Sequence, residues 1–206
     1  MKKMSLKKIE EFIIAAGSDD LATFGGSFEG GIHCQQIPDE LAPCIHKIME
    51  IGSTVFSYLE IGVAAGGTTF IFDHFFEPYK MVLVDDNKHH KAGLRPDILL
   101  HVPAIEIIGR SSDQATVAAA KAQALYDIIV IDGDHTYAAV KTDTLLYMPM
   151  LSPGGFLILH DSVMQEWGVA RVVFELKYDL GMEFVAEYVS AKHPRPLGVA
   201  LFRRTS

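Results

Sequence analysis

Residues 56–69, FSYLEIGVAAGGTT, have the composition of a turn that binds a cofactor. An apolar, strand-like run carries Glu60 and is followed by Gly62, Gly66 and Gly67, after which Thr68 begins a run typical of a helix. Glycines let the backbone come close to a ligand, and a helix N-terminus offers free N–H groups. The carboxylate of Glu60 would repel a pyrophosphate but suits an ammonium group or a ribose hydroxyl. The pattern Glu-x-Gly-x-x-x-Gly differs from the Gly-x-Gly-x-x-Gly of dinucleotide binders. We therefore expect a nucleotide-cofactor cradle of another kind, with a purely structural turn as the alternative.

Polar side chains follow every apolar segment that we predict to be a parallel strand. They are Glu60, Asp85, Ser111 with Asp113, Asp132 with His135, and His160 with Asp161. Because ligands of open α/β sheets bind outside the carboxyl ends of the strands, five such positions in a row predict a site along that edge. Two of these residues have simpler alternatives. Asp132 could cap the next helix, and His160 could be a structural hydrogen-bond donor to a neighbouring loop.

The order of apolar and helical segments predicts the elements that hold these residues. We expect helices over residues 5–16 and 38–51, joined by a Gly-rich loop over 17–37 that is either a surface connector or a lid over the site. Strands and helices then alternate, with strands over 55–61, 80–84, 105–108, 127–131 and 156–159, and helices over 68–76, 114–124, 137–148 and 168–180. For residues 87–102 the sequence predicts no regular element. Two last strands, 183–189 and 199–202, are joined by a short Pro-containing connection and so resemble a hairpin.

These elements predict an α/β fold with a doubly wound, mostly parallel seven-stranded sheet and an antiparallel last strand. We expect residues 1–37 to form an N-terminal helix and loop, and residues 38–206 to form one Rossmann-like domain.

Composition excludes several classes of protein. The chain has 206 residues, of which 49% are hydrophobic and 21% charged, as in a globular domain. A formal net charge of −8 argues against nucleic-acid binding, and no apolar run reaches the length of a membrane span. Cys34 and Cys44 give neither zinc spacing nor a disulfide framework, which fits a reducing cytoplasm. The helix over 5–16 could pack on its own domain or on a partner chain, so a homo-oligomer stays open.

The motifs in their order resemble those of the class I S-adenosylmethionine-dependent methyltransferases, over about residue 35 to the C-terminus. The sequence is most similar to the metal-assisted O-methyltransferases of the catechol type and to a related group, tied to sugar and natural-product pathways, that carries D-G-D-H-x-Y. The matching pieces are LEIG with Gly66 and Thr68, Asp85, Gly-x-Ser-x-Asp at 109–113, DIIVIDGDHTY at 127–137, L-x-PGG at 151–155, and HDS at 160–162.

This resemblance implies roles for the matching residues. Glu60 and the loop from Gly62 through Ala64 to Gly66, with Thr68, would hold the methionine end of the cofactor. Asp85 would accept the ribose hydroxyls, Ser111 or Asp113 would lie near the adenine, and Asp132 would be both a cofactor contact and a catalytic residue. Asp132 and Asp161 would bind a divalent cation such as Mg²⁺, and His135 would be the catalytic base.

The sequence also departs from the catechol-type pattern. Ser162 follows the second metal aspartate where those enzymes have asparagine, and His160 precedes it where they have a small residue. The expected metal is therefore Mg²⁺ or Mn²⁺, a softer ion bound through His160 and His135, or none. The expected activity is O-methylation of a small hydroxylated acceptor, such as a sugar, a phenol or a natural product. The alternatives are a nicotinamide-dependent Rossmann oxidoreductase, against which Ala64 and Glu60 count, and a non-catalytic cofactor-binding module.

Overall fold

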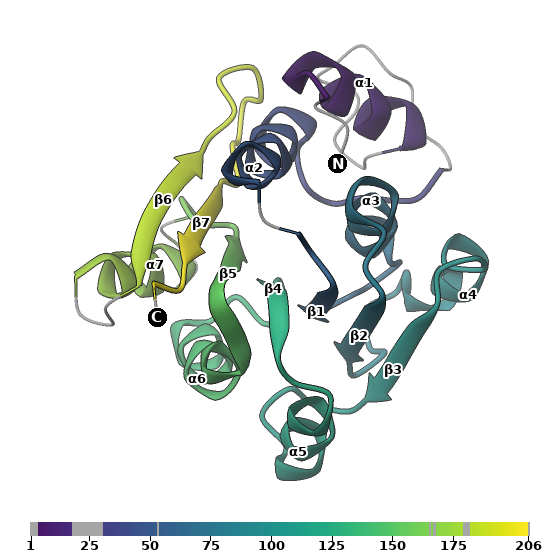
Figure 1. Cartoon of the computed structure of the whole chain (residues 1–206), viewed down its shortest axis with the longest axis vertical. Helices are drawn as coiled ribbons and strands as arrows, with labels where there is room; N and C mark the ends of the chain where they lie inside the picture. Colours follow the sequence, from purple (N-terminus) through teal and green to yellow (C-terminus); the bar gives the residue numbers. More distant parts are fainter. Residues whose placement is uncertain are drawn as a thin grey trace.

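The computed structural model describes residues 4–17, 31–52, 54–164, 166, 168–178 and 182–205. Its seven strands lie in one sheet in the order β3-β2-β1-β4-β5-β7-β6 (Figure 1). Their bounds are β1 Ser57–Ile61, β2 Lys80–Asp85, β3 Ala104–Ile108, β4 Tyr126–Ile131, β5 Leu151–His160, β6 Glu183–Tyr188 and β7 Val199–Arg203. Strands β1 to β5 pair in parallel, and β7 runs antiparallel to both β5 and β6. The predicted sheet is confirmed, and its strand order reverses between β1 and β4, where open α/β sheets bind their ligands.

Helices cover both faces of the sheet. The helices α1 Leu6–Ala16, α2 Pro38–Ile51 and α3 Gly67–Phe76 lie on one face, and α5 Gln114–Ala122, α6 Tyr137–Tyr147 and α7 Val169–Tyr178 lie on the other (Figure 1). The short helices η2 Ala92–Leu94 and α4 Arg95–Ile98 follow β2, and η3 Met148–Met150 follows α6. Within the described ranges, none of the helices has the length and apolar run that crossing a bilayer requires.

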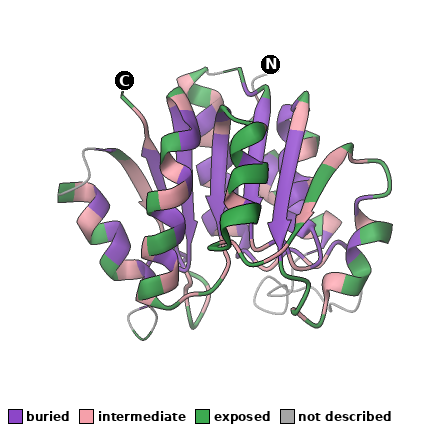
Figure 2. Ribbon diagram, turned by 90° about the horizontal axis from the view of Figure 1, so that it is seen from below, coloured by how far each residue is buried: buried purple, intermediate pink, exposed green. Residues whose placement is uncertain are grey.

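Strand β1 shows why the sheet carries a core on each face. All five of its residues are buried, and because side chains alternate along a strand they enter two different clusters. Tyr58 packs with α1, α2 and α3, whereas Leu59 and Ile61 pack with α5, α6 and α7. Figure 2 shows the central strands as a buried layer between partly exposed helices.

Most predicted boundaries agree with the structure within two residues, and two of the differences have local causes. Strand β1 begins at Ser57 instead of residue 55, because the carboxylate of Asp127 takes the backbone N–H groups of Phe56 and Ser57 at 2.9 and 3.0 Å. Strand β5 begins at Leu151 instead of residue 156, because Leu151 already pairs with Tyr126 ahead of a register shift. Residues 18–30 of the predicted loop and residues 179 and 180, the end of the predicted last helix, lie outside the described residues.

Candidate active site

A cavity of about 1130 Å³ lies at the carboxyl ends of the parallel strands. The loops after β1, β2, β3, β4 and β5 all contribute to its lining, together with residues 33–36 and Leu197. It exceeds the roughly 300–1,000 Å³ of ordinary ligand pockets, which leaves room for a cofactor and a second molecule. Of the predicted residues, the cavity lining includes Glu60, Gly62, Ala64, Thr68, Asp85, Ser111, Asp132, His135, His160 and Asp161. Gly66 and Asp113 are not among the lining residues.

The loop after β1 is held against two other segments at its glycines. Gly62 has φ +82°, and a Cβ there would lie 2.2 Å from the carbonyl oxygen of Asp132. A Cβ on Gly67 would lie 2.6 Å from the backbone of Cys34. Close backbone approach therefore requires glycine at both positions, and it brings the start of α3 against the β4 loop and the N-terminal segment.

Glu60 lies on the floor of the cavity with its carboxylate inside the fold. Its Oε2 accepts hydrogen bonds from the hydroxyls of Tyr58 at 2.7 Å and Thr69 at 2.5 Å, and its side chain is 1% exposed. Burial raises the pKa of Glu60 to about 8, although the two hydroxyls act in the opposite direction. In the free protein this carboxyl is therefore mostly protonated at neutral pH.

Asp85 shapes the loop after β1 through that loop's backbone. One carboxylate oxygen accepts from the N–H groups of Val63 and Ala64 at 2.7 and 3.0 Å, and the other accepts from Asn87 at 2.6 Å. Arg95 closes the arrangement from α4, because its guanidinium donates to the carbonyl of Ala64 at 2.8 and 3.0 Å and lies 3.2 Å from Asp85. Sequence reasoning missed Arg95, which lies in the segment for which no regular element was predicted.

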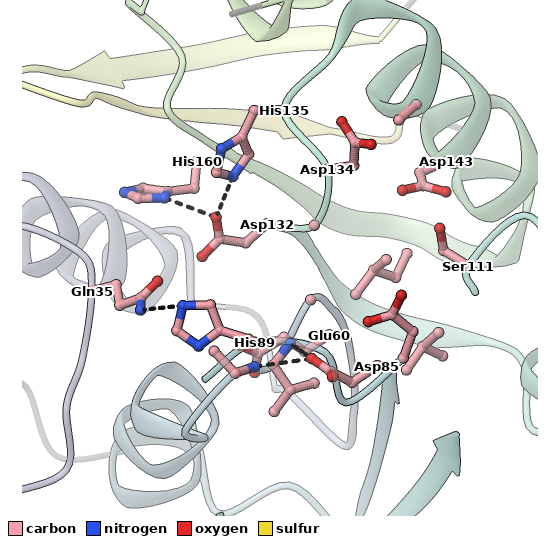
Figure 3. A pocket seen from close by; sticks show the side chains of 18 of the residues that line it. Gln35, Glu60, Asp85, His89, Ser111, Asp132, Asp134, His135, Asp143 and His160 are labelled. Carbon is pink, nitrogen blue, oxygen red and sulfur yellow. Dashed lines mark hydrogen bonds and ion pairs between the residues drawn. The ribbon is translucent and has the colours of Figure 1, made fainter. Parts of the chain in front are cut away.

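Two carboxylates and two histidines meet at one end of the cavity (Figure 3). The Nδ1 atom of His160 lies 2.9 Å from Asp132 Oδ1 and 3.2 Å from Asp161 Oδ2. The Nε2 atom of His135 lies 3.1 Å from Asp161 Oδ2 and 3.5 Å from Asp132 Oδ1. His160 is buried, whereas the side chain of His135 is 31% exposed. Asp132, Asp161 and both histidines, all predicted from the sequence, are therefore brought together.

The charges of this cluster compensate one another. Burial alone would raise the pKa of Asp132, but His160 and His135 hold it below its ordinary value. Burial would lower the pKa of both histidines, but Asp132 and then Asp161 raise the pKa of His135, and the same two carboxylates raise that of His160 well above its ordinary value. The carboxylates thus favour the protonated form of each histidine, and the histidines favour the ionised form of Asp132.

Asp161 has an unusual backbone conformation, and three buried polar atoms at Asp161 and its two neighbours lack hydrogen-bond partners. Asp161 has φ +59°, a left-handed conformation that a non-glycine residue rarely adopts and that concentrates at functional sites. Asp161 Oδ1, the hydroxyl of Ser162 and Nε2 of His160 are buried and have no hydrogen-bond partner among the described residues. Buried polar atoms are normally paired, so these three are exceptions to that rule.

Gln36 joins the N-terminal segment to this cluster, and sequence reasoning missed it as well. Its amide Nε2 donates to Asp132 Oδ2 at 2.6 Å, and its Oε1 accepts from the hydroxyl of Thr68 and from the thiol of Cys34. The neighbouring Gln35 contacts His89, which follows β2, at 3.3 Å (Figure 3). The predicted loop over 17–37 therefore contributes side chains to the site in its described part. A glutamine two residues before a helix-starting proline carries no sequence signal for this role.

The other end of the cavity lies between the loop after β3 and helix α6. Ser111 lines it as predicted, but the acidic residue beside Ser111 is Asp143 of α6, whereas Asp113 is exposed at the N-cap of α5. Figure 3 shows Ser111 and Asp143 on the opposite side of the cavity from His160 and Gln35.

Comparisons with known proteins identify the family of this chain. A model of the family described as a methyltransferase domain matches residues 59–162, half of the chain. A comparison with curated protein sequences gives no match. Together with the fold and the site, the family match shows that the chain belongs to this family and is a class I S-adenosylmethionine-dependent methyltransferase.

Solved structures agree in fold. The N-methyltransferase NodS from Bradyrhizobium japonicum WM9, in complex with S-adenosylhomocysteine, has a TM-score of 0.64 at 17% identity, covering 98% of this chain and 100% of NodS. The O-methyltransferase TomG from Streptomyces achromogenes, in complex with S-adenosylmethionine, has a TM-score of 0.64 at 14% identity, covering 97% and 90%. The MycE methyltransferase of the mycinamycin pathway, in complex with Mg, S-adenosylhomocysteine and mycinamycin VI, has a TM-score of 0.61 at 17% identity, covering 98% of this chain and 55% of MycE.

Proposed function

We propose that this enzyme transfers the methyl group of S-adenosylmethionine to a hydroxyl oxygen of a small polar acceptor, with assistance from a divalent cation. The observation that carries the proposal is the meeting of Asp132, His135 and Asp161 at one end of the cavity, beside the glycine loop. A hydroxyl is a weak nucleophile at neutral pH, so its methylation requires a base and a stabilised oxygen charge. A carboxylate–histidine cluster supplies groups for both tasks.

The donor set supports a divalent cation at this end of the cavity. One ligand atom from each of Asp132, His135 and Asp161 lies within 4.8 Å of the others. Carboxylate oxygens with imidazole nitrogen suit Mg²⁺ or Mn²⁺, and Oδ1 of Asp161 is buried without a hydrogen-bond partner among the described residues. We assign Asp132 and Asp161 as ligands. His160, predicted as a ligand, is better placed to orient them, because its Nδ1 contacts both carboxylates from the buried side.

The other roles in the reaction are assigned to individual side chains of this chain. A divalent cation at the two aspartates would stabilise the negative charge that develops on the acceptor oxygen. We assign His135, the more exposed of the two histidines, as the base that takes the hydroxyl proton; a cation at the two aspartates would supply the positive charge there and leave the imidazole neutral. We assign Glu60 to the ammonium group of the cofactor's methionine end, with Gly62, Ala64 and Thr68 forming the loop around it. The family resemblance implies that Asp85 accepts the ribose hydroxyls, and these would share its carboxylate with the backbone N–H groups of Val63 and Ala64.

The walls of the cavity favour a polyhydroxylated acceptor such as a sugar over a phenol. Its described lining includes no phenylalanine, tyrosine or tryptophan on which an aromatic acceptor would stack. Instead, His33, Gln35 and His89 present polar groups beside the cluster. Such groups recognise hydroxyls by hydrogen bonds, and rejection of analogues that lack a hydroxyl follows from the same contacts.

Two variants test these roles separately. We expect His135→Ala to abolish methyl transfer and to leave the affinity for S-adenosylhomocysteine unchanged, measured by calorimetry. We expect Asp132→Asn to remove the dependence of turnover on divalent ions. Wild-type turnover in His135→Ala would exclude His135 as the base, and a wild-type rate that never responds to divalent ions or chelator would exclude the cation.

A further inference from the structure

A buried carboxylate outside the cation cluster joins helix α2 to the connection between β6 and β7. Glu40 lies in the first turn of α2 and is 0% exposed. Its Oε1 accepts hydrogen bonds from the backbone N–H groups of Ser190 at 2.8 Å and Leu197 at 3.2 Å, and its Oε2 accepts from Gly198 at 2.8 Å. A carboxylate in the first turn of a helix ordinarily serves the N-terminus of that helix. Glu40 instead holds a segment that lies 150 to 158 residues further along the chain.

The environment of Glu40 suits an ionised carboxylate that holds backbone. An ionised carboxylate only accepts hydrogen bonds, which matches three N–H donors. Burial raises the pKa of Glu40, whereas the N–H groups of Ser190 and Gly198 oppose this shift. Because hydrogen bonds to a charged acceptor are stronger than neutral ones, Glu40 is a strong anchor for the end of the β6–β7 connection.

The segment that Glu40 holds is bonded in turn to the loop after β5. The carbonyl of Gly198 accepts from the N–H of Ser162 at 3.2 Å, and the carbonyl of Leu197 accepts from the N–H of Val163 at 3.1 Å. Gly198 also fits closely against this loop, because it has φ +85° and a Cβ there would lie 2.5 Å from the hydroxyl oxygen of Ser162. A continuous path of hydrogen bonds therefore runs from Glu40 through the main chain to the loop after β5.

This loop presents Asp161 to the cavity. Strands β5 and β7 pair up to His160 and Val199, and Asp161 follows directly with φ +59°. A left-handed conformation at a non-glycine residue is costly and persists only where the surroundings hold it. The β5–β7 ladder holds Asp161 from one side, and the bonds to Leu197 and Gly198 hold it from the other.

We propose that Glu40 is a positioning residue for Asp161. It fixes Leu197 and Gly198, and the carbonyls of that segment hold the loop after β5 in the conformation that places the Asp161 carboxylate at the cation site. This inference rests on the proposed role of Asp161 as a ligand. Leu197 also lines the cavity, so the same anchor fixes part of the cavity wall.

A first measurement compares metal and cofactor binding in Glu40→Gln, which keeps the size of the side chain. Mn²⁺ binding, followed by electron paramagnetic resonance at neutral pH, should weaken by roughly 10-fold, because groups that orient a metal ligand commonly contribute that much to affinity. The affinity for S-adenosylhomocysteine should stay unchanged, since Glu40 does not line the cavity. Asp39→Asn is the matched control. Asp39 holds the same connection through the hydroxyl of Ser190 at 3.0 Å, and its substitution should leave Mn²⁺ affinity unchanged.

A second measurement follows the link itself without any metal. Amide hydrogen exchange, measured by NMR, should be roughly 10-fold faster or more at Ser162 and Val163 in Glu40→Gln, because the segment that accepts from them has lost its charged anchor. Both amides should keep their wild-type rates in Asp39→Asn. Glu40→Asp, which keeps the charge on a shorter side chain, replaces Glu40→Gln in both measurements if the latter does not fold.

The outcomes separate this proposal from the proposed function. Wild-type Mn²⁺ affinity in the Glu40 variant would overturn the positioning role, and so would wild-type exchange rates at Ser162 and Val163. Equal weakening of Mn²⁺ and S-adenosylhomocysteine would show a general loss of structure and would overturn it as well. If the wild-type enzyme bound no Mn²⁺, the proposed cation would fail, and the exchange rates alone would decide whether Glu40 positions the loop that carries Asp161.

Discussion

Glu60 gives the sharpest quantitative prediction, because its proposed partner changes its protonation. A carboxyl with a pKa of about 8 binds about 0.9 proton at pH 7 and about 0.5 at pH 8. An ammonium group held against Glu60 favours the ionised form. Binding of S-adenosylhomocysteine should therefore release about 0.9 proton at pH 7 and about half a proton at pH 8.

Titration calorimetry in phosphate and in Tris measures this release, because the two buffers differ in their enthalpy of protonation. The apparent binding enthalpy should differ between the buffers in proportion to the protons released. Glu60→Gln keeps the size of the side chain, binds the ligand more weakly and should show no difference between buffers. Identical enthalpies in both buffers for the wild-type enzyme would refute the reasoning, because Glu60 would then be ionised before binding or neutral after it.

Three further predictions follow from the same contacts. Gly62→Ala should destabilise the fold by about 3 kcal/mol in urea unfolding, because its Cβ would meet the Asp132 carbonyl. Gly93→Ala, with open space around it, should change stability by less than about 0.5 kcal/mol. Equal effects of the two substitutions would contradict the close approach at Gly62. Gln36→Leu should weaken Mn²⁺ binding by roughly 10-fold, because Asp132 loses the amide that orients it, whereas Gln35→Leu should not. Unchanged Mn²⁺ affinity in Gln36→Leu would exclude Gln36 as the residue that orients Asp132. Folding raises the pKa of Glu60 from its ordinary 4.5 to about 8, so the wild-type stability should fall as the pH rises from about 4.5 to 8. Thermal unfolding of Glu60→Gln should show a weaker dependence of stability on pH. The same dependence in both proteins would contradict the raised pKa.

The strand ends were predictable from the sequence for a simple physical reason. In a buried parallel sheet an apolar run marks a strand, and the first polar residue after it marks the edge at which ligands bind. Asp132, Asp161 and both histidines were found this way, and the structure places them within 3.5 Å of a partner in one cluster. The separate roles of the two histidines could not be predicted from the sequence. His160 is buried and His135 is partly exposed, and no local sequence pattern indicates this difference.

Residues outside the strand ends were missed because their local patterns have other, commoner explanations. Gln36 and Arg95 lie in irregular or short helical segments, where polar residues usually face solvent. Asp143 did leave a signal. It shares the helical spacing of Ala139 and Tyr147, so a carboxylate occupies a face of α6 whose other members are buried or half-buried. Asp113, in contrast, fits the expected motif but is the N-cap residue of α5 and does not line the cavity. In the loop after β3, Ser111 lines the cavity instead.

Methyl transfer by the wild-type enzyme to polyhydroxylated acceptors, with Mg²⁺ and with a chelator, tests the central claim most directly. Product analysis should find the methyl group on oxygen, with turnover in Mg²⁺ and none with the chelator, while S-adenosylhomocysteine still binds in both conditions. Methylation of nitrogen, or oxygen methylation at the same rate with the chelator, would contradict the assignment of the Asp132–His135–Asp161 cluster to metal-assisted O-methylation.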